Sequence, residues 1–102
     1  MTWRPGDSLV YVIEAVGLNA VKIGSTTDLA KRLSMLQVGC PALLRVVLTI
    51  EGDRHLECDL HSRFAKLSIR GEWFCFTEEI RKLQLEYPSA TGHPANRFGW
   101  TG

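Results

Sequence analysis

Side chains suited to chemistry on phosphate recur through the first two thirds of the chain. They comprise a tyrosine, an isolated lysine, a lysine–arginine pair, and a glutamate followed four residues later by a histidine. A guanidinium matches the geometry of a phosphate group, and a carboxylate can bind Mg²⁺ while the ion keeps several waters. A phenol accepts a proton near neutral pH only if its pKa of about 10 is lowered. These residues are Tyr11, Lys22, Lys31, Arg32, Glu57 and His61.

Tyr11 and Lys22 are predicted to face each other in a β-hairpin. Residues 9–14 are rich in β-branched and aromatic side chains, which is typical of a strand, and residues 20–24 predict the returning strand. With the turn centred on residues 16–17, Tyr11 lies opposite Lys22 and both side chains point to the same face. The ammonium then favours the phenolate and lowers the pKa of Tyr11. The aliphatic side chains on the other face are expected to form the core.

The arginine is predicted to lie on a helix that follows this hairpin. Residues 25–28 form a cluster of N-cap side chains, and leucines follow at i, i+4 and i+7 from Leu29. Gly39 is expected to end the helix. Arg32 then lies at the margin of the apolar face, and Lys31 lies nearly opposite that face.

The glutamate and the histidine are predicted to be neighbours on a second helix. Residues 43–50 indicate a third strand, and Asp53 can cap the helix that comes after it. Glu57 and His61 are four residues apart, so they lie next to each other along one margin of the buried stripe. That stripe is formed by Leu56, Leu60, Phe64 and Leu67.

These elements predict one domain of the α/β (α+β) class, with a small three-stranded antiparallel sheet flanked by helices. The domain is expected over residues 9–87, after a short lead at residues 1–8 and before a flexible tail at residues 88–102. Within the domain, residues 71–76 predict a short aromatic strand or extended segment. A third helix is expected over residues 77–87.

The charge, hydropathy and cysteine content of the chain exclude several classes of function. The chain has 102 residues and a formal net charge of +1, which excludes a polybasic nucleic-acid binder and requires a local basic patch for any contact with DNA. Residues 22–45 supply such a patch, with four basic side chains against Asp28 alone. No apolar stretch approaches the roughly 20 residues of a membrane span. The three cysteines lack the pattern of a disulfide framework, so a cytoplasmic protein with reduced thiols is expected.

The order and spacing of several short motifs point to a known nuclease superfamily. The motifs are Leu9-Val10-Tyr11, Lys22-Ile23-Gly24-Ser25-Thr26, Lys31-Arg32-Leu33, Glu57 with Leu60-His61, and Gly71-Glu72-Trp73-Phe74. Together they resemble the GIY-YIG nuclease superfamily over about residues 9–85. The chain is most similar to a phage-type, DNA-binding branch related to the meiotically up-regulated gene family. In that branch the first motif is loosened and the second becomes Lys-Ile-Gly.

The resemblance implies a metal-dependent DNA endonuclease and gives each matched residue a role. Tyr11 would be the general base or would orient the attacking water, with Lys22 beside it. Arg32 would bind the scissile phosphate. Glu57 would hold one divalent metal, Mg²⁺ or Mn²⁺, and His61 would contact a phosphate or orient the glutamate. A domain this small is also expected to work as a homodimer or with a partner protein.

Two other classes of function remain open on the sequence. One is a DNA-binding module of the same fold that does not cleave. The other is a small protein-interaction domain in which Tyr11 and Trp73 serve only in packing, which is the commoner role of a strand tyrosine. A zinc site would need paired ligands at two knuckles, and only Cys58 with His61 offers such a pair.

Overall fold

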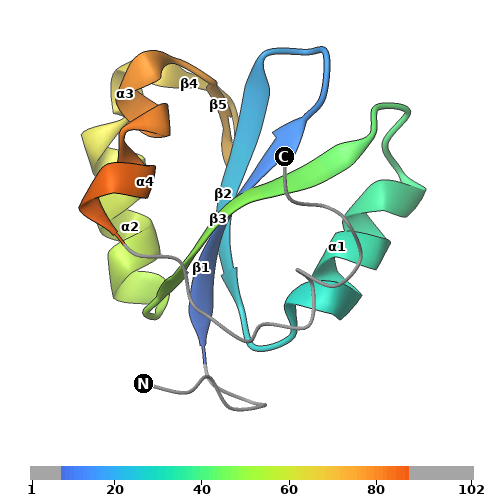
Figure 1. The fold of residues 1–102 in the computed structure, drawn as a ribbon, viewed down its shortest axis with the longest axis horizontal. Coiled ribbons are helices and arrows are strands. Elements are labelled where there is room, and N and C mark those ends of the chain that lie inside the picture. Colours follow the sequence, from blue (N-terminus) through green and yellow to red (C-terminus); the bar gives the residue numbers. More distant parts are fainter. Residues whose placement is uncertain (1–7, 88–102) are drawn as a thin grey trace.

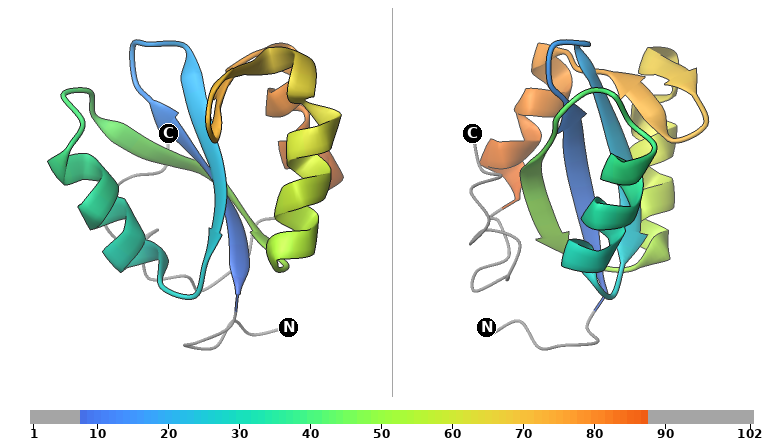
Figure 2. Two further views of the ribbon diagram at one scale, coloured as in Figure 1. Left: turned by 180° about the vertical axis from the view of Figure 1, so that it is seen from behind. Right: turned by 90° about the vertical axis from the view of Figure 1, so that its right-hand side faces the viewer.

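Helices cover both faces of a five-stranded antiparallel sheet in the computed structural model, which describes residues 8–87 (Figure 1, Figure 2). The strands are β1 (Leu9–Ala15), β2 (Ala20–Thr26), β3 (Leu44–Glu51), β4 (Ser68–Arg70) and β5 (Trp73–Cys75). The helices are α1 (Leu29–Val38), α2 (Arg54–Arg63), α3 (Glu78–Arg81) and α4 (Leu83–Glu86), with a 3₁₀ turn at Ala65–Leu67. The strand order is β3-β1-β2-β5-β4, so β1 and β2 lie inside the sheet.

The prediction of a three-stranded sheet was wrong, although the α+β class is confirmed. The three expected strands form the β3-β1-β2 part, and a hairpin of β4 and β5 extends the sheet beyond β2. Each of these added strands has only three residues, which is too short for a clear alternation of side chains. The residues just before β4 were predicted to continue the second helix, but α2 ends at Arg63.

The β1–β2 hairpin has a register two residues away from the predicted one. Tyr11 pairs with Gly24, and Lys22 pairs with Ile13. The difference arises at the turn, where the chain uses four residues between the strands and adopts positive φ angles of 89° at Gly17 and 53° at Asn19. A shift by an even number of residues leaves every side chain on its predicted face, so Tyr11 and Lys22 still share one face of the sheet.

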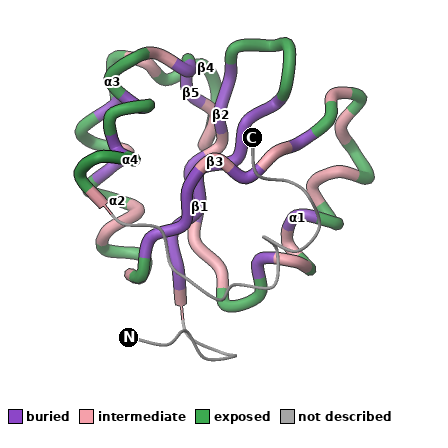
Figure 3. The backbone as a smooth tube through the Cα atoms, viewed as in Figure 1, coloured by how far each residue is buried: buried purple, intermediate pink, exposed green. Residues whose placement is uncertain are grey.

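Both faces of the sheet are buried, so strand β1 is enclosed along its whole length (Figure 3). The predicted core face, with Val10, Val12 and their partners on β2, packs against α2, α3 and α4. The opposite face packs against α1 and forms a second core. That second core includes Tyr11, because the leucines of α1 close over this face of β1.

The predicted caps of the first two helices are confirmed. The Asp28 side chain accepts a hydrogen bond from the Lys31 amide at 3.1 Å, and Asp53 accepts one from the His55 amide at 2.9 Å. The predicted third helix is divided into α3 and α4 at Lys82. The expected lead and tail fall largely or wholly outside the described residues. Within residues 8–87 no helix is long and apolar enough to cross a membrane.

Candidate active site

The candidate site lies where strand β2 leaves the sheet. Strand β5 pairs with β2 only at Ala20, Val21 and Lys22, and one further hydrogen bond joins the Ile23 amide to the Glu72 carbonyl at 3.1 Å. The rest of β2 therefore has no strand neighbour on that side. Helix α1 lies on one face of the sheet here and α2 lies on the other, so side chains from both layers can meet around this edge (Figure 2).

The Tyr11 ring lies against the glycine of the Lys-Ile-Gly motif. A Cβ atom at Gly24 would come within 2.6 Å of Tyr11 Cζ, so any side chain there would displace the ring. The tyrosine is fully buried, and its hydroxyl has no hydrogen-bond partner within 3.5 Å among the residues that the structure describes. A buried polar group without a partner is costly and uncommon, which marks this hydroxyl as a candidate for a functional role.

The charges around the hydroxyl differ from the predicted arrangement. Burial raises the pKa of Tyr11 above its ordinary value of 10.0. The positive charge of Arg32 and a weak side-chain hydrogen bond from its guanidinium lower this pKa, and the carboxylates of Glu72 and Glu57 raise it. The expected cation, Lys22, instead pairs with Glu72 at 3.2 Å and lies 5.7 Å from the ring centroid of Trp73. The pKa of the phenol is thus raised, and Arg32 is the cation that acts on it.

Arg32 occupies the predicted margin of α1. It is half-buried, whereas Lys31 beside it is exposed. Among residues 8–87 the Arg32 side chain forms no ion pair, so its guanidinium is available for an anion. Arg32 lies close enough to Tyr11 to lower the pKa of the phenol.

Glu57 reaches this edge from the opposite face, on the first turn of α2. Its Oε1 atom accepts a hydrogen bond from Ser25 Oγ at 2.5 Å, and its Oε2 atom lies 3.7 Å from His61 Nε2. The Glu57 side chain is only 12% exposed. These contacts hold the carboxylate against β2, close enough to Tyr11 to affect the pKa of the phenol.

His61 is tied to the backbone of β2. Its Nε2 atom lies 2.8 Å from the Ile23 carbonyl oxygen, and because a carbonyl can only accept, Nε2 must carry the proton. The ring also packs on Phe74 at 5.1 Å between centroids. His61 and Glu57 are neighbours, as their spacing predicts. The Nε2 proton of the histidine is donated to the backbone of β2 and not to the glutamate.

The acidic groups near the site allow a divalent metal with few protein ligands. Among residues 8–87 there is no group of three or more His, Cys, Asp or Glu side chains arranged to hold a metal ion. Glu57 offers one carboxylate oxygen without a hydrogen bond shorter than 3.5 Å. A single carboxylate suits Mg²⁺, which keeps most of its water ligands and accepts phosphate oxygens.

Two contacts of the site were not predicted from the sequence. Ser25 holds Glu57, and Glu72 neutralises Lys22. Alternation along β2 places Ser25 on the face opposite Gly24, and this could have indicated a contact with the second helix. The Glu72 contact depends on the β4–β5 hairpin. The sequence predicted a short strand or extended segment over residues 71–76, where β5 lies, but not strand β4 or the pairing of β5 with β2.

Comparisons with known proteins place most of the chain in one domain family. Searches among curated proteins and among solved structures gave no match. The T5orf172 domain matches residues 8–85, which include all the strands and both helices that carry the site. The chain therefore belongs to the phage-related T5orf172 domain family.

Proposed function

We propose that this protein is a DNA endonuclease of the GIY-YIG type that depends on Mg²⁺ or Mn²⁺. One observation carries the proposal: Arg32 of α1 and Glu57 of α2 both act on the pKa of the Tyr11 phenol, and Ser25 of β2 binds Glu57. Phosphodiester hydrolysis needs an activated water and stabilisation of the charge on the phosphate, and a phenol, a guanidinium and a metal-binding carboxylate can supply these.

Each side chain has a distinct part in this mechanism. Arg32 binds a non-bridging oxygen of the scissile phosphate and offsets the negative charge that develops there. Glu57 would hold the metal, which would supply Lewis-acid chemistry at the phosphate. Tyr11 binds the attacking water and takes its proton or orients it, and His61 fixes the helix that carries Glu57 to the strand.

The burial of Tyr11 sets a condition on this mechanism. Its hydroxyl has no contact with solvent, so water reaches it only after a neighbouring side chain moves. Arg32 is the flexible neighbour, and a phosphate would draw its guanidinium outward. A cation on Glu57 would cancel the carboxylate charge that raises the pKa of the phenol, which brings Tyr11 closer to the range of a general base.

The second candidate is a DNA-binding module that does not cleave. The raised pKa of Tyr11 favours it, because a phenol that keeps its proton is a poor base. In this case Arg32 and its neighbours would bind phosphate without hydrolysis. In both cases we propose a cytoplasmic protein whose small footprint on DNA is extended by a second copy or by a partner protein.

Plasmid relaxation with Mg²⁺ or Mn²⁺, alongside DNA binding in EDTA, separates these candidates. Glu57→Gln should abolish metal-dependent nicking and leave binding in EDTA unchanged or tighter, because it removes a negative charge near the phosphates. Glu79→Gln, an exposed glutamate on α3, is the matched control and should nick normally. If the unaltered protein binds DNA but never nicks it, the binding module is the correct function. If it does not bind DNA at all, both candidates fail.

A further inference from the structure

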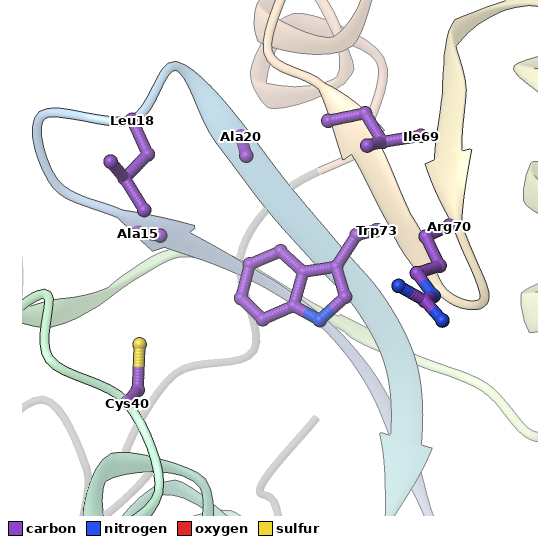
Figure 4. A pocket seen from close by; sticks show the side chains of 7 residues that line it. All are labelled: Ala15, Leu18, Ala20, Cys40, Ile69, Arg70 and Trp73. Atoms are coloured by element: carbon purple, nitrogen blue, oxygen red, sulfur yellow. The ribbon is translucent and has the colours of Figure 1, made fainter.

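A small apolar pocket lies on the same face of the sheet as Tyr11, toward the β1–β2 turn (Figure 4). Its volume is about 240 Å³. Trp73 of β5 forms its broadest wall, Leu18 comes from the turn, Cys40 from the loop after α1, and Ile69 with Arg70 from β4. Ala15 and Ala20 also line the pocket, and their small side chains leave its interior empty.

The pocket adjoins the candidate active site along β2. Trp73 pairs with Lys22, and Lys22 is two residues before Gly24, over which the Tyr11 ring lies. Side chains two residues apart on one face of a strand are about 7 Å apart. A DNA strand that places a phosphate beside Arg32 can therefore extend along β2 and bring a neighbouring nucleotide to Trp73.

The chemistry of the pocket suits one flat aromatic ring attached to an anion. Its volume is below the roughly 300–1,000 Å³ of a pocket for a drug-sized ligand, and its walls are an indole and aliphatic side chains. No acidic side chain lines it. Arg70 stands at the rim, and within the described part of the chain it forms no ion pair. It can meet a phosphate while Trp73 meets a base.

We infer that this pocket binds an unpaired nucleobase from the nucleotide next to the phosphate at Arg32. The inference rests on the proposed action on DNA and adds a preference for a DNA structure. A base inside a duplex is stacked and paired, so it would have to leave the helix at a cost of a few kcal/mol. The protein should therefore prefer single-stranded, bulged or gapped DNA, where the base is already free.

The exposed side chains at the mouth fit this occupant. Leu18 is 63% exposed and Ile69 is 54% exposed, on opposite sides of the pocket. Aliphatic side chains there can pack against the edges of a base that is stacked on Trp73. Stacking of a base on an aromatic side chain tolerates any sequence, so the preference should follow pairing state and not base identity.

The experiment measures binding in EDTA to a short duplex with a single unpaired thymine and to the same duplex fully paired. We expect tighter binding to the unpaired form. Trp73→Ala should weaken binding to that form by about 5- to 100-fold and leave the paired duplex nearly unaffected. Trp73→Phe should keep most of the preference. Leu85→Ala, an exposed leucine on α4, is the control and should change neither affinity.

A second variant is needed because Trp73 packs against the second core, beside α1, so that Trp73→Ala could also disturb folding. Leu18→Glu changes an exposed turn residue and places a negative charge at the mouth, so it should also reduce the preference for the unpaired form. Equal affinity of the unaltered protein for both DNAs would overturn the inference. An equal loss of affinity for both DNAs in Trp73→Ala would also overturn it. A change of oligomeric state in Trp73→Ala, measured by size-exclusion chromatography, would do so as well, because it would show that a second protein chain covers the pocket.

These outcomes are independent of cleavage. A protein that prefers the unpaired form through Trp73 but never nicks DNA supports the pocket and rejects the endonuclease. A protein that nicks DNA with no preference for unpaired bases supports the endonuclease and rejects the pocket.

Discussion

The hydroxyl of Tyr11 is one of two buried side-chain hydroxyls in the described structure without a hydrogen-bond partner within 3.5 Å, the other being that of Thr77. The Tyr11 hydroxyl is enclosed by two layers of the fold and is subject to opposing charges from Arg32 and two glutamates. Leaving a buried hydroxyl unpaired costs about 1–3 kcal/mol. This cost is offset if a bound water or phosphate forms a hydrogen bond with the hydroxyl when DNA is present.

Replacement of Tyr11 by phenylalanine should separate stability from activity. Tyr11→Phe keeps the ring and removes only the unpaired hydroxyl, so the thermal midpoint should stay the same or rise. Metal-dependent nicking should fall by roughly 10²–10⁴-fold, the usual contribution of a general base. A clear loss of thermal stability would contradict this account, because it would show that the hydroxyl makes a structural hydrogen bond.

The raised pKa of Tyr11 predicts how stability depends on alkaline pH. The folded state holds the phenol proton more tightly than the unfolded state, whose pKa is about 10. This contribution to stability is therefore complete below pH 10 and is lost as the pH rises toward the folded-state pKa. Denaturant unfolding should show a steeper loss above pH 10 in the unaltered protein than in Tyr11→Phe.

Titration of the phenol checks the cause of that shift. In a Tyr87→Phe background only Tyr11 gives a phenolate absorbance. Arg32→Gln should raise its pKa further, and Glu57→Gln should lower it, because these charges act in opposite directions. An unchanged titration in both variants would mean that neither side chain lies near the hydroxyl.

At the scale of elements, β2 connects the two layers of the site. One face of its Lys-Ile-Gly-Ser segment receives the Tyr11 ring at Gly24, and the other face presents Ser25 to Glu57 on α2. His61 of the same helix reaches the Ile23 carbonyl. The strand thus sets the position of the tyrosine and of the glutamate relative to each other.

The glycine of this segment should be intolerant of a side chain. Gly24→Ala places a methyl group against the Tyr11 ring, and such overpacking typically costs about 1–3 kcal/mol of unfolding free energy. Gly39→Ala is the matched control, because a Cβ there meets no atom within 4 Å and its φ of −94° suits alanine. Denaturant unfolding of both variants tests this, and equal stability would contradict the contact with Tyr11.

The serine should position the glutamate. Ser25→Ala removes the hydrogen bond to Glu57, which should weaken metal-dependent nicking more than it weakens DNA binding in EDTA. Ser25→Thr keeps a hydroxyl and should restore much of the activity. Thr27→Ala, at an exposed position just after β2, is the control. If Ser25→Ala nicks like the unaltered protein, the contact has no part in the function.

At the scale of the whole molecule, the extents of 33 × 28 × 21 Å limit the surface available to DNA. The net charge of +1 adds little attraction, so binding must depend on a few local cations. Arg32 and Arg70 are without ion pairs among the described residues, whereas Lys22 is paired with Glu72.

The salt dependence of DNA binding should rank these cations. If Arg32 contacts a phosphate, Arg32→Gln should reduce the slope of log affinity against log salt by about 1. Lys22→Met should have a smaller effect, because its ammonium is already neutralised. Lys66→Gln, an exposed lysine in the 3₁₀ turn, is the control. A slope that changes with Lys22 and not with Arg32 would reverse this assignment.

The sequence by itself determined the features that depend on neighbours along the chain. The α+β class, the first three strands, the helix caps at Asp28 and Asp53, and the adjacency of Glu57 and His61 all follow from local periodicity and capping. These predictions were correct because each feature is set by residues only a few positions apart in the sequence.

Only the tertiary structure decided which distant groups meet. The β1–β2 register depends on backbone angles in the turn, so the partner of Tyr11 became Gly24 and not Lys22. The β4–β5 hairpin is stabilised by pairing with β2, and without it neither the Lys22–Glu72 pair nor the Trp73 pocket could be predicted. The burial of Tyr11 likewise needs α1 to close over the sheet. Contacts between elements distant in sequence leave no periodic pattern in either segment, so packing alone determines them.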